Sequence, residues 1–372
     1  MAHNLTIEPL GATICVRAGQ TLLDAALRSG IAIPHACGHG LCGTCKVRVI
    51  DGTVDLGDAS PFALMDFERD EGCALACCAT VEDDVTIEAD VEEEPDAQFI
   101  PIRDFTATVV RMADLTPTIR GIWLQLVGEH GSGPGGEQGD AENAAANPAP
   151  LHFQAGQYVS LHMPGGVGTR AFSIASPPDG TGLIELNVRR VPGGRGTAHL
   201  HDALNLGDEL PLTGPYGRFF VRSGARQPMI FMAGGSGLSS PRSMILDRLA
   251  AGEDQQITLI YGQRTRDELY YHDEFVALAA RHANFTYVPA LSHDAPGSGW
   301  DGARGMVHDV AGALFSSDFR GHKAYLCGPP LMVEACIATL MQGRLFERDI
   351  YTERFISAAD AQQIRSPLFK TI

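Results

Sequence analysis

The sequence predicts a multidomain fold with three successive parts: a small α+β domain, an antiparallel β-barrel and an α/β domain with a parallel sheet. A chain of 372 residues is too long for one ordinary hydrophobic core. The pattern of apolar residues also changes twice, near residue 100 and again near residue 226. We therefore expect domains at residues 1–98, 101–225 and 226–372.

Short strands and one helix are expected in the first domain. The runs LTIEPL, ATICVR, KVRVIDG and VTIEADV read as strands, because apolar residues recur in short segments between turns. The segment TLLDAALRSG predicts a helix, since Thr21 is a good N-cap and Gly30 a good terminator. The acidic stretch EEEPDAQFIPIRD then marks the domain boundary.

Four cysteines of this domain follow the order C-x4-C-x2-C with a distant fourth, which is the ligand spacing of plant-type 2Fe-2S clusters. They are Cys37, Cys42, Cys45 and Cys77. Glycines 38, 40 and 43 let the loop fold tightly and aim N–H groups at sulfur. Structural zinc is the alternative, but its ligands usually form two C-x2-4-C pairs, whereas three of these cysteines fall in one loop. The pattern favours a one-electron iron–sulfur centre.

Strands separated by Gly and Pro predict an antiparallel barrel for the second domain. The runs are TATVVRM, TIRGIWLQLV, GQYVSLHMP, RAFSIAS, LIELNVRRV and DELPLTG. Residues from about 128 to 150 are rich in Gly, Ala, Asn and Pro and cannot bury a core. We expect them to form a flexible surface insert.

Two stretches of the barrel suit a flavin nucleotide. Arg170, Ala171, Phe172 and Ser173 supply a cation, an aromatic face and a hydroxyl at the start of a strand. Downstream, NVRRVPGGRGT begins with Asn187, Val188 and Arg189, and its turn from Gly194 to Thr197 suits a pyrophosphate. An edge strand followed by a hairpin is the alternative interpretation of these residues.

Strands alternate with helices from Gln227 onward, which predicts a parallel α/β sheet. Two glycine-rich turns follow apolar strands, so both are expected at the carboxyl edge of the sheet, framing one dinucleotide crevice. The turns hold Gly234, Gly235 and Gly237, and Cys327, Gly328 and Pro329. Ser240 replaces the third glycine of the usual fingerprint, and no acid ends the next strand, so the pattern excludes an ordinary Rossmann dehydrogenase. The Cys327 thiol is expected either to contact a nicotinamide ring or to be a buried strand-end cysteine.

Together the three parts suggest an order of electron transfer. A nicotinamide gives up two electrons as hydride, a flavin accepts both and can release them singly, and the cluster takes one at a time. No Glu-x-x-His occurs in the sequence, so the motif of oxygen-activating di-iron bundles is missing. The electrons are therefore expected to leave for another protein.

The net charge of −17 lies mostly in the first domain. Residues 1–100 contain 18 acidic and 5 basic side chains, a net charge of −13. Nucleic acid is thereby an improbable partner, since phosphate binding needs clustered Lys and Arg. The acidic run from Glu82 to Asp96 is either a solvated edge or a docking face for a basic protein. No basic leader or apolar run of about 18 residues is present, so we expect a cytoplasmic protein without membrane association.

Longer motifs resemble a known family. ACGHGLCGTCKV, ASPFALMDFERDE, LACCA, RAFS, AGGSGLSSPRSMILD, YLCGPP, TLMQGRLFERDIYTERF and SPLFKTI resemble the reductases of bacterial multicomponent oxygenases, especially phenol hydroxylases, in the ferredoxin-NADP reductase superfamily. The resemblance implies a β-grasp 2Fe-2S ferredoxin domain, an FAD-binding barrel and an NAD-binding domain with a C-terminal segment that covers the flavin.

The resemblance also implies roles for individual residues. Ser173, Cys327 and Glu353 match the residues nearest the reacting flavin and nicotinamide, and are the expected catalytic set. Arg170 matches an FAD phosphate ligand, and Phe355 an aromatic residue that covers the flavin. Phe172 stands where the family more often has tyrosine, and the residues from Gly194 to Thr197 match its pyrophosphate motif.

The function implied is electron transfer from NADH through FAD and the 2Fe-2S cluster to a separate di-iron monooxygenase that hydroxylates phenol or a related aromatic. Arg264 and Arg266 lie near the expected position of a ribose phosphate and would suit NADPH. The prediction of NADH rather than NADPH therefore rests on the resemblance. A reductase for a Rieske-type ring dioxygenase is the alternative within the enzymes. A ferredoxin-like carrier whose nucleotide domains only regulate docking is the alternative of another class.

Overall fold

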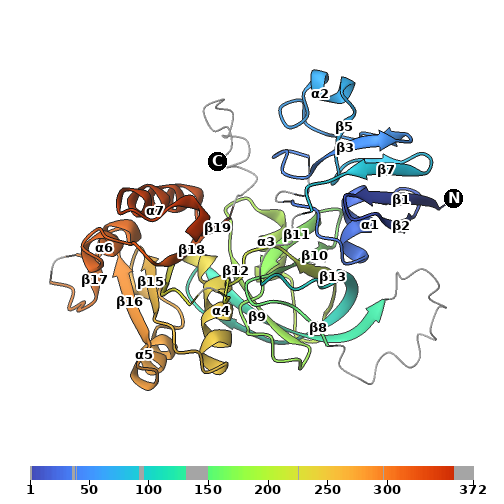
Figure 1. The fold of residues 1–372 in the computed structure, drawn as a ribbon. Coiled ribbons are helices and arrows are strands. Elements are labelled where there is room, and N and C mark those ends of the chain that lie inside the picture. The colour runs from blue at the N-terminus through green and yellow to red at the C-terminus, as the bar shows by residue number, and fades with distance from the viewer. Residues whose placement is uncertain are drawn as a thin grey trace. The chain divides into compact units, whose positions relative to one another are not determined.

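The computed structural model describes residues 2–35, 38, 40–91, 96–130, 150–224, 226–295 and 297–355 (Figure 1). Cys37, nearly all of the predicted insert and the chain from residue 356 lie outside the described residues. The chain forms two compact units. The first is built mainly on Met1–Phe105, and the second holds most of the chain from Thr106 onward, including both predicted nucleotide-binding parts.

A five-stranded sheet forms the centre of the first unit, in the order β2-β1-β7-β3-β5. Its elements are β1 (His3–Glu8), β2 (Ala12–Val16), α1 (Leu22–Arg28), β3 (Lys46–Asp51), α2 (Asp66–Asp70), β5 (Cys73–Leu75) and β7 (Val85–Glu88), with a side pair of β4 (Val54–Asp55) and β6 (Thr80–Val81). The predicted helix is confirmed, and Thr21 caps it by accepting a hydrogen bond from the Asp24 N–H.

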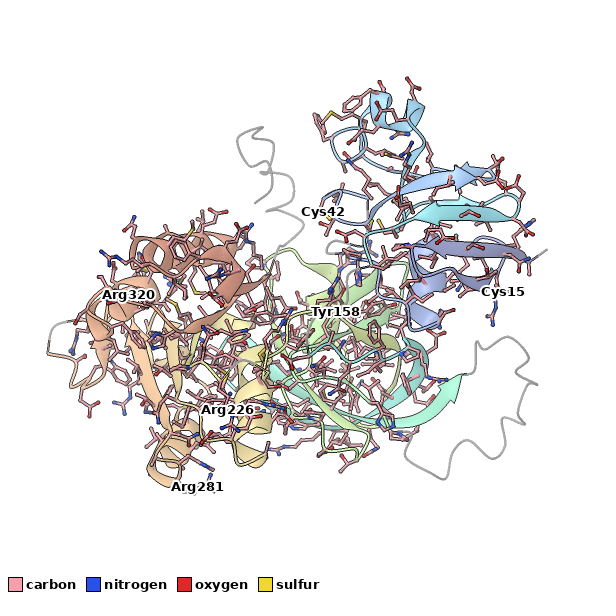
Figure 2. All side chains as sticks on the ribbon, in the orientation of Figure 1. Cys15, Cys42, Tyr158, Arg226, Arg281 and Arg320 are labelled. Atoms are coloured by element: carbon pink, nitrogen blue, oxygen red, sulfur yellow. The ribbon has the colours of Figure 1, made fainter. Side chains whose placement is uncertain are left out.

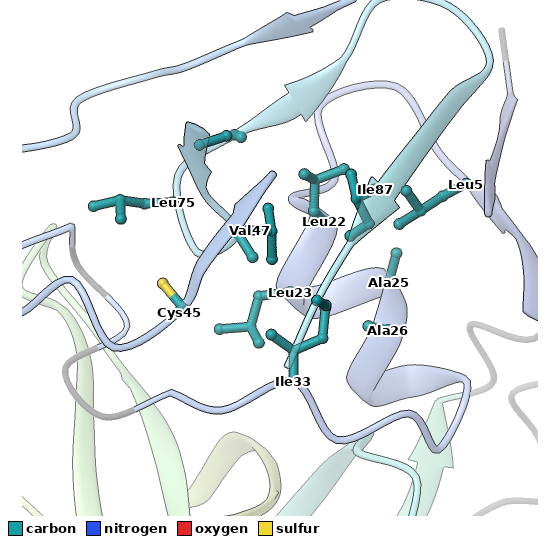
Figure 3. Packing of buried hydrophobic residues seen from close by; sticks show 14 of the residues in the cluster. Leu5, Leu22, Leu23, Ala25, Ala26, Ile33, Cys45, Val47, Leu75 and Ile87 are labelled. Atoms are coloured by element: carbon teal, nitrogen blue, oxygen red, sulfur yellow. The ribbon is translucent and has the colours of Figure 1, made fainter. Parts of the chain in front are cut away.

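The core of this unit lies between α1 and the sheet. Figure 3 shows Leu22 of the helix beside Leu5 and Ile87 of the sheet, and all three are fully buried. Cys45 lies at the edge of the same cluster and is almost completely buried. The core therefore holds the end of the predicted cluster loop in place.

The barrel is a six-stranded antiparallel sheet in the order β11-β10-β13-β8-β9-β12. Its strands are β8 (Arg103–Asp114), β9 (Ile119–His130), β10 (Tyr158–Met163), β11 (Gly168–Ser173), β12 (Leu183–Arg189) and β13 (Glu209–Tyr216). A bridge between Ile174 and Leu186 links its two edges. Helix α3 (Arg195–Asp202) was not predicted: the sequence GGRGT reads as a turn, but it opens a two-turn helix.

The C-terminal sheet is wholly parallel, as predicted, in the order β17-β16-β15-β14-β18-β19. Its strands are β14 (Met229–Gly234), β15 (Ile257–Gln263), β16 (Phe285–Leu291), β17 (Ala303–Arg304), β18 (Lys323–Gly328) and β19 (Ile350–Arg354). The connecting helices are α4 (Ser239–Ala250), α5 (His272–Arg281), α6 (Val307–Leu314) and α7 (Pro330–Gln342).

Successive side chains of β14 point to opposite faces of the sheet, and both faces are covered by helices. Phe231 packs in a cluster with residues of α4 and α5, whereas Ile230 and Met232 pack with residues of α6 and α7. A strand buried on both faces has no polar alternation, as PMIFMA shows. Among the described residues, no helix combines the length and apolar character needed to cross a bilayer.

Candidate functional site

Two hydrogen bonds reach cysteine sulfur atoms in the described part of the predicted cluster site. The Gly40 N–H donates to the Sγ of Cys77 over 3.3 Å, and the Thr44 hydroxyl donates to the Sγ of Cys42 over 3.2 Å. Such hydrogen bonds stabilise thiolate ligands. The predicted ligands Cys42, Cys45 and Cys77 lie among the described residues, and Cys42 is labelled in Figure 2.

Gly40 is required by its surroundings. Its φ is +72°, and a Cβ there would lie 2.6 Å from the Sγ of Cys78 and 3.2 Å from the carbonyl oxygen of Asp58. A side chain would therefore push the loop away from Cys77, the neighbour of Cys78. Within the described part of the chain, no three His, Cys, Asp or Glu side chains form a group suited to one metal ion.

In the barrel, the predicted flavin residues gather at the N-terminus of α3. A Cβ on Gly196 would lie 3.1 Å from the Cγ of Arg170, so the arginine stem passes directly over the first turn of this helix. Thr197 accepts a hydrogen bond from the Val191 N–H and donates to the Gly194 carbonyl, which fixes the turn. A cation beside the N–H groups of a helix N-terminus suits a pyrophosphate.

Strand β11 presents the remaining flavin candidates. Ala171 is exposed, Phe172 is half-buried and Ser173 is buried. Ser173 pairs with Tyr158 on β10, which Figure 2 labels. The strand therefore extends from the exposed Arg170 to the buried hydroxyl of Ser173.

Strand β12 contributes an orphaned polar group. Both the nitrogen and the oxygen of the Asn187 carboxamide are buried, and neither has a hydrogen-bond partner. An unpaired buried amide is costly, so this position fits a bound polar ligand. The guanidinium of Arg189 lies 3.1 Å from where a Cβ on Gly235 would stand. Val188 is fully buried, and its side chain belongs to the core.

The two glycine-rich turns meet at the carboxyl edge of the parallel sheet, as predicted. Ala233 and Cys327 are register partners on β14 and β18. A Cβ on Gly237 would stand 2.5 Å from the Cys327 carbonyl oxygen and 2.6 Å from the Cα of Gly328. Gly237 is thus needed for contact between the turns. Pro329 caps α7 immediately afterwards.

The expected catalytic residues converge on one carboxylate oxygen. The Oε2 of Glu353, on β19, accepts hydrogen bonds from Ser240 at 2.7 Å, Ser173 at 3.1 Å and the Cys327 thiol at 3.6 Å. Ser173 comes from the barrel, and the other three residues come from the parallel sheet domain. Phe355 follows two residues later, and its N–H donates to the Gly328 carbonyl.

Burial raises the pKa of Glu353, and the hydrogen bonds from Ser240, Ser173 and Cys327 partly oppose this rise. Burial also raises the pKa of Cys327 well above its usual range, and the neighbouring Glu353 carboxylate adds to the effect. Cys327 is therefore a neutral thiol that donates a hydrogen bond. Cys327 is fully buried at the end of its strand, as the second of its two predicted roles requires, and contact with a nicotinamide ring stays a prediction.

Ser240 is the member of this group that the sequence did not indicate as functional. It was recognised only as a departure from the dinucleotide fingerprint, where glycine usually stands. A hydroxyl at the start of α4 reaches Glu353 from a position 113 residues away in the chain. The serine in place of the usual glycine was the feature of the sequence that could have indicated this role.

A buried ion network joins the barrel to the parallel sheet domain. Arg242 on α4 donates to both oxygens of Glu274 at 2.8 and 3.0 Å, to Glu185 of β12 at 3.0 Å and to the Ala175 carbonyl at 2.8 Å. Tyr271 donates to the other oxygen of Glu185, and its ring lies 4.0 Å from the Arg242 guanidinium. The network thus holds the segment after Ser173 against the helix that begins near Ser240.

Comparisons with known proteins agree with this arrangement. Residues 5–82 match a 2Fe-2S iron-sulfur cluster binding domain, residues 144–221 an oxidoreductase FAD-binding domain and residues 231–337 an oxidoreductase NAD-binding domain. The chain is 52% identical to the phenol 2-monooxygenase reductase component DmpP of Pseudomonas sp. strain CF600 and 51% identical to the phenol hydroxylase P5 protein of Acinetobacter pittii. Both alignments span the whole of each protein.

The chain belongs to this family of reductase components. It is an oxidoreductase of the ferredoxin-NADP reductase superfamily, with domains for a 2Fe-2S cluster, FAD and NAD. The family match decides against the structural zinc considered for the cysteine loop, and against a carrier whose nucleotide domains only regulate docking.

Solved structures support the same fold. The cytochrome P450 reductase GcoB of Amycolatopsis aligns with a TM-score of 0.82 at 33% identity, over 95% of this chain and 98% of that one. The ferredoxin reductase of carbazole 1,9a-dioxygenase aligns with a TM-score of 0.76 at 27% identity, over 95% and 99%. The predicted combination of β-grasp ferredoxin, antiparallel barrel and parallel sheet is confirmed.

The raised pKa of Glu353 gives a pH prediction. Three donors share one oxygen of this residue, an arrangement that favours the carboxylate, so protonation weakens these hydrogen bonds. Because the pKa lies above the ordinary glutamate value, the rate of flavin reduction by NADH should fall at a higher pH than an ordinary glutamate would cause. Stopped-flow flavin absorbance between about pH 5 and 8 measures this. In Glu353→Gln, flavin reduction should be slower and should not show this fall in rate at low pH. An identical pH profile in the variant and the wild-type protein would contradict the role of Glu353.

Proposed function

We propose that this reductase oxidises NADH, passes the electrons through FAD to the 2Fe-2S cluster, and delivers them singly to a separate di-iron monooxygenase that hydroxylates phenol or a related aromatic. The convergence of Ser173, Ser240 and Cys327 on Glu353, at the junction of the FAD and NAD domains, is the main structural support. A cytoplasmic location is part of the same proposal.

The protein's own residues have distinct tasks in this scheme. Arg170 and the N-terminus of α3 would bind the FAD pyrophosphate, and Asn187 offers a buried amide to the flavin or nicotinamide. Ser173, Cys327 and Glu353 are the proposed catalytic residues, which orient the reacting rings and exclude water between them. The flavin supplies the conversion of a two-electron donor to single-electron transfer.

The remaining residues are proposed for binding the nucleotides. Gly234, Gly235, Gly237, Gly328 and Pro329 form the paired turns at which the NADH phosphates would approach the backbone. Thr197 and Gly194 support the FAD turn through their mutual hydrogen bond. Phe355 follows Glu353 at the same edge and is proposed to cover the flavin.

Glu268 supports NADH over NADPH. Its Oε2 accepts a hydrogen bond from the Arg264 N–H over 3.1 Å, which brings a carboxylate to the end of β15. An acid at this strand end favours a ribose diol and disfavours a 2′-phosphate. The sequence did not indicate this, because Glu268 follows the strand by five residues and returns through a turn.

A phenol-type oxygenase is favoured over a Rieske dioxygenase by the degree of similarity. Full-length identity is 51–52% to two phenol hydroxylase reductases but 27% to the carbazole dioxygenase reductase, which shares the fold. Reconstitution tests the choice: the reductase should restore hydroxylation to a phenol hydroxylase oxygenase component and not to a Rieske oxygenase. The opposite result would reverse the assignment.

Anaerobic titration tests the internal order of electron transfer. Addition of NADH should bleach both the flavin and the cluster absorbance, whereas NADPH should do so only at much higher concentration. Bleaching of the flavin alone by NADH would contradict the proposed path to the cluster.

The Arg170 assignment predicts a loss of FAD affinity. Arg170→Ala should weaken FAD binding by about 1.5 to 3 kcal/mol, or roughly 10- to 150-fold, because a charge-assisted phosphate contact is lost. Fluorescence titration of the FAD-depleted protein measures this. Arg281→Ala is the control, since Arg281 is an exposed residue on α5 (Figure 2). Equal affinities in the two variants would contradict the role of Arg170.

A further inference from the structure

Four large apolar side chains of the first unit are exposed: Leu41 in the cysteine loop, and Phe62, Met65 and Phe67 in the segment that leads into helix α2 and in its first turn. The exposed fractions are 92% for Phe62, 59% for Leu41, 57% for Phe67 and 38% for Met65. Single exposed apolar residues are ordinary, but a group of this size marks an interaction site. We name these four residues the rim surface.

The rim surface is held in a fixed position. The Ser60 N–H donates to the Gly40 carbonyl over 3.0 Å, and the Arg69 guanidinium donates to the Ala59 carbonyl, also over 3.0 Å. Ala59 and Leu64 are buried on either side of Phe62. Phe62 is therefore displayed by an anchored turn, so little conformational entropy would be lost when a partner covers it.

The same surface adjoins a predicted cluster ligand. Leu41 directly precedes Cys42, and a Cβ on Gly43 would stand 3.2 Å from the carbonyl oxygen of Ala63, the neighbour of Phe62. Electron transfer between proteins requires close approach to the centre. A protein that covers Phe62 and Leu41 would reach this edge of the loop.

Exposed carboxylates flank Phe62, Met65 and Phe67 in the sequence. Asp58, Asp66, Asp70 and Glu71 are exposed, and the structure records no ion pair for any of them within its described residues. Glu68, by contrast, is held by Lys46 at 2.5 Å. In the acidic run proposed from the sequence, Asp84 binds Asn4 and Asp83 binds the Thr53 N–H, while residues 92–95 lie outside the described part. The exposed carboxylates beside Phe62 are therefore the better candidates for steering a partner.

Net charge also limits which molecule can bind to the rim surface. A second copy of this chain has a net charge of −17, and the part beyond residue 100 has −4, so both would be repelled by the first domain at −13. The occupant must offer a basic face with an apolar socket.

We infer that the rim surface is the docking site for the oxygenase component, with Phe62 inserted in an apolar socket and the surrounding carboxylates facing basic side chains. The inference rests on the proposed function, because it assumes an oxygenase as the electron acceptor. Aromatic anchors with a charged rim are typical of interfaces whose affinity comes from a few residues.

Phe62→Ala tests the inference, with Leu10→Ala as the control because Leu10 is a half-exposed apolar residue of the same unit. Each variant is titrated into the oxygenase component of a bacterial phenol hydroxylase during turnover. Phe62→Ala should raise the reductase concentration needed for half-maximal hydroxylation by about 10- to 30-fold, and Leu10→Ala should not change it. The cluster absorbance spectrum verifies that each variant is folded.

A second readout separates the oxygenase from other occupants. Reduction of the cluster by NADH, followed by stopped flow without oxygenase, should be unchanged in Phe62→Ala. Slower internal reduction would mean that the rim surface faces the chain's own flavin, and a changed oligomeric state would mean a second copy; either overturns the inference. The paired change Asp66→Asn and Asp70→Asn should weaken the salt dependence of turnover.

Failure of this inference differs from failure of the proposed function. If the wild-type reductase drives hydroxylation and Phe62→Ala does so equally well at low concentration, the rim surface is not the docking site. If the wild-type protein cannot drive hydroxylation at all, the proposed function is wrong and the docking inference falls with it.

Discussion

Cys42→Ser should abolish electron transfer to the oxygenase while NADH-driven reduction of ferricyanide through FAD continues. A serine hydroxyl is a poor iron ligand at neutral pH, so the cluster should be lost or strongly weakened. Most of the FAD-binding barrel and the whole NAD-binding domain belong to the other compact unit, so we expect both to stay folded when the cluster is lost. The expected result is a fall to background in oxygenase-coupled turnover and no more than a twofold change, roughly, in ferricyanide reduction.

Cys15→Ser is the matched control for this experiment. Cys15 is an exposed cysteine of the same unit, on β2, and is not a predicted ligand. It should retain the visible spectrum of the cluster and full activity in both assays. Retention of the cluster in Cys42→Ser, or its loss in Cys15→Ser, would show that the ligand assignment is wrong.

Arg242→Met should have the largest effect on stability, lowering the free energy of unfolding by about 3 to 5 kcal/mol. Arg242 neutralises Glu185, whose side chain is only 4% exposed, and also binds Glu274. Methionine fills a similar volume but leaves the Glu185 carboxylate buried without its cation. Urea denaturation, followed by FAD fluorescence and circular dichroism, measures the change.

Arg248→Met provides the comparison on the same helix. Arg248 forms ion pairs with Asp247 and Glu253, but all three side chains are more exposed than Arg242 and Glu185. Surface pairs of this kind contribute about 1 kcal/mol or less. Similar losses in the two variants would contradict the structural importance of the Arg242 network.

The sequence predicted the elements that long apolar periodicity marks clearly. The parallel strands β14, β15 and β16 and the helix capped by Thr21 follow from hydrophobic runs bounded by turn residues. Helix α2, with five residues, is too short to show a helical period, and the eight-residue α3 was missed because it opens within GGRGT, which reads as a turn. Tertiary contacts, rather than local propensity, stabilise elements of this length.

The candidate site likewise contains residues that motifs predicted and features that only the folded structure reveals. Cys327 and Glu353 were identified through motifs, and adjacent positions on parallel strands β18 and β19 explain why they meet. The hydrogen bond from Ser240 depends on how α4 lies against β19, and the orphaned amide of Asn187 depends on the packing around β12; no local pattern encodes either. The exposure of Phe62 is equally hidden, since a phenylalanine in sequence suggests a core residue.

The Arg242 network has a consequence for exchanging modules among reductases of this family. Its acidic partner Glu185 belongs to the barrel, whereas Arg242 and Glu274 belong to the parallel sheet domain. A chimera that joins this barrel to a foreign NAD-binding half keeps Glu185 buried and needs a cation in the place of Arg242 to neutralise it. The barrel and the parallel sheet domain are therefore best exchanged together. A chimera whose boundary lies between them needs Glu185, Arg242 and Glu274 from the same reductase.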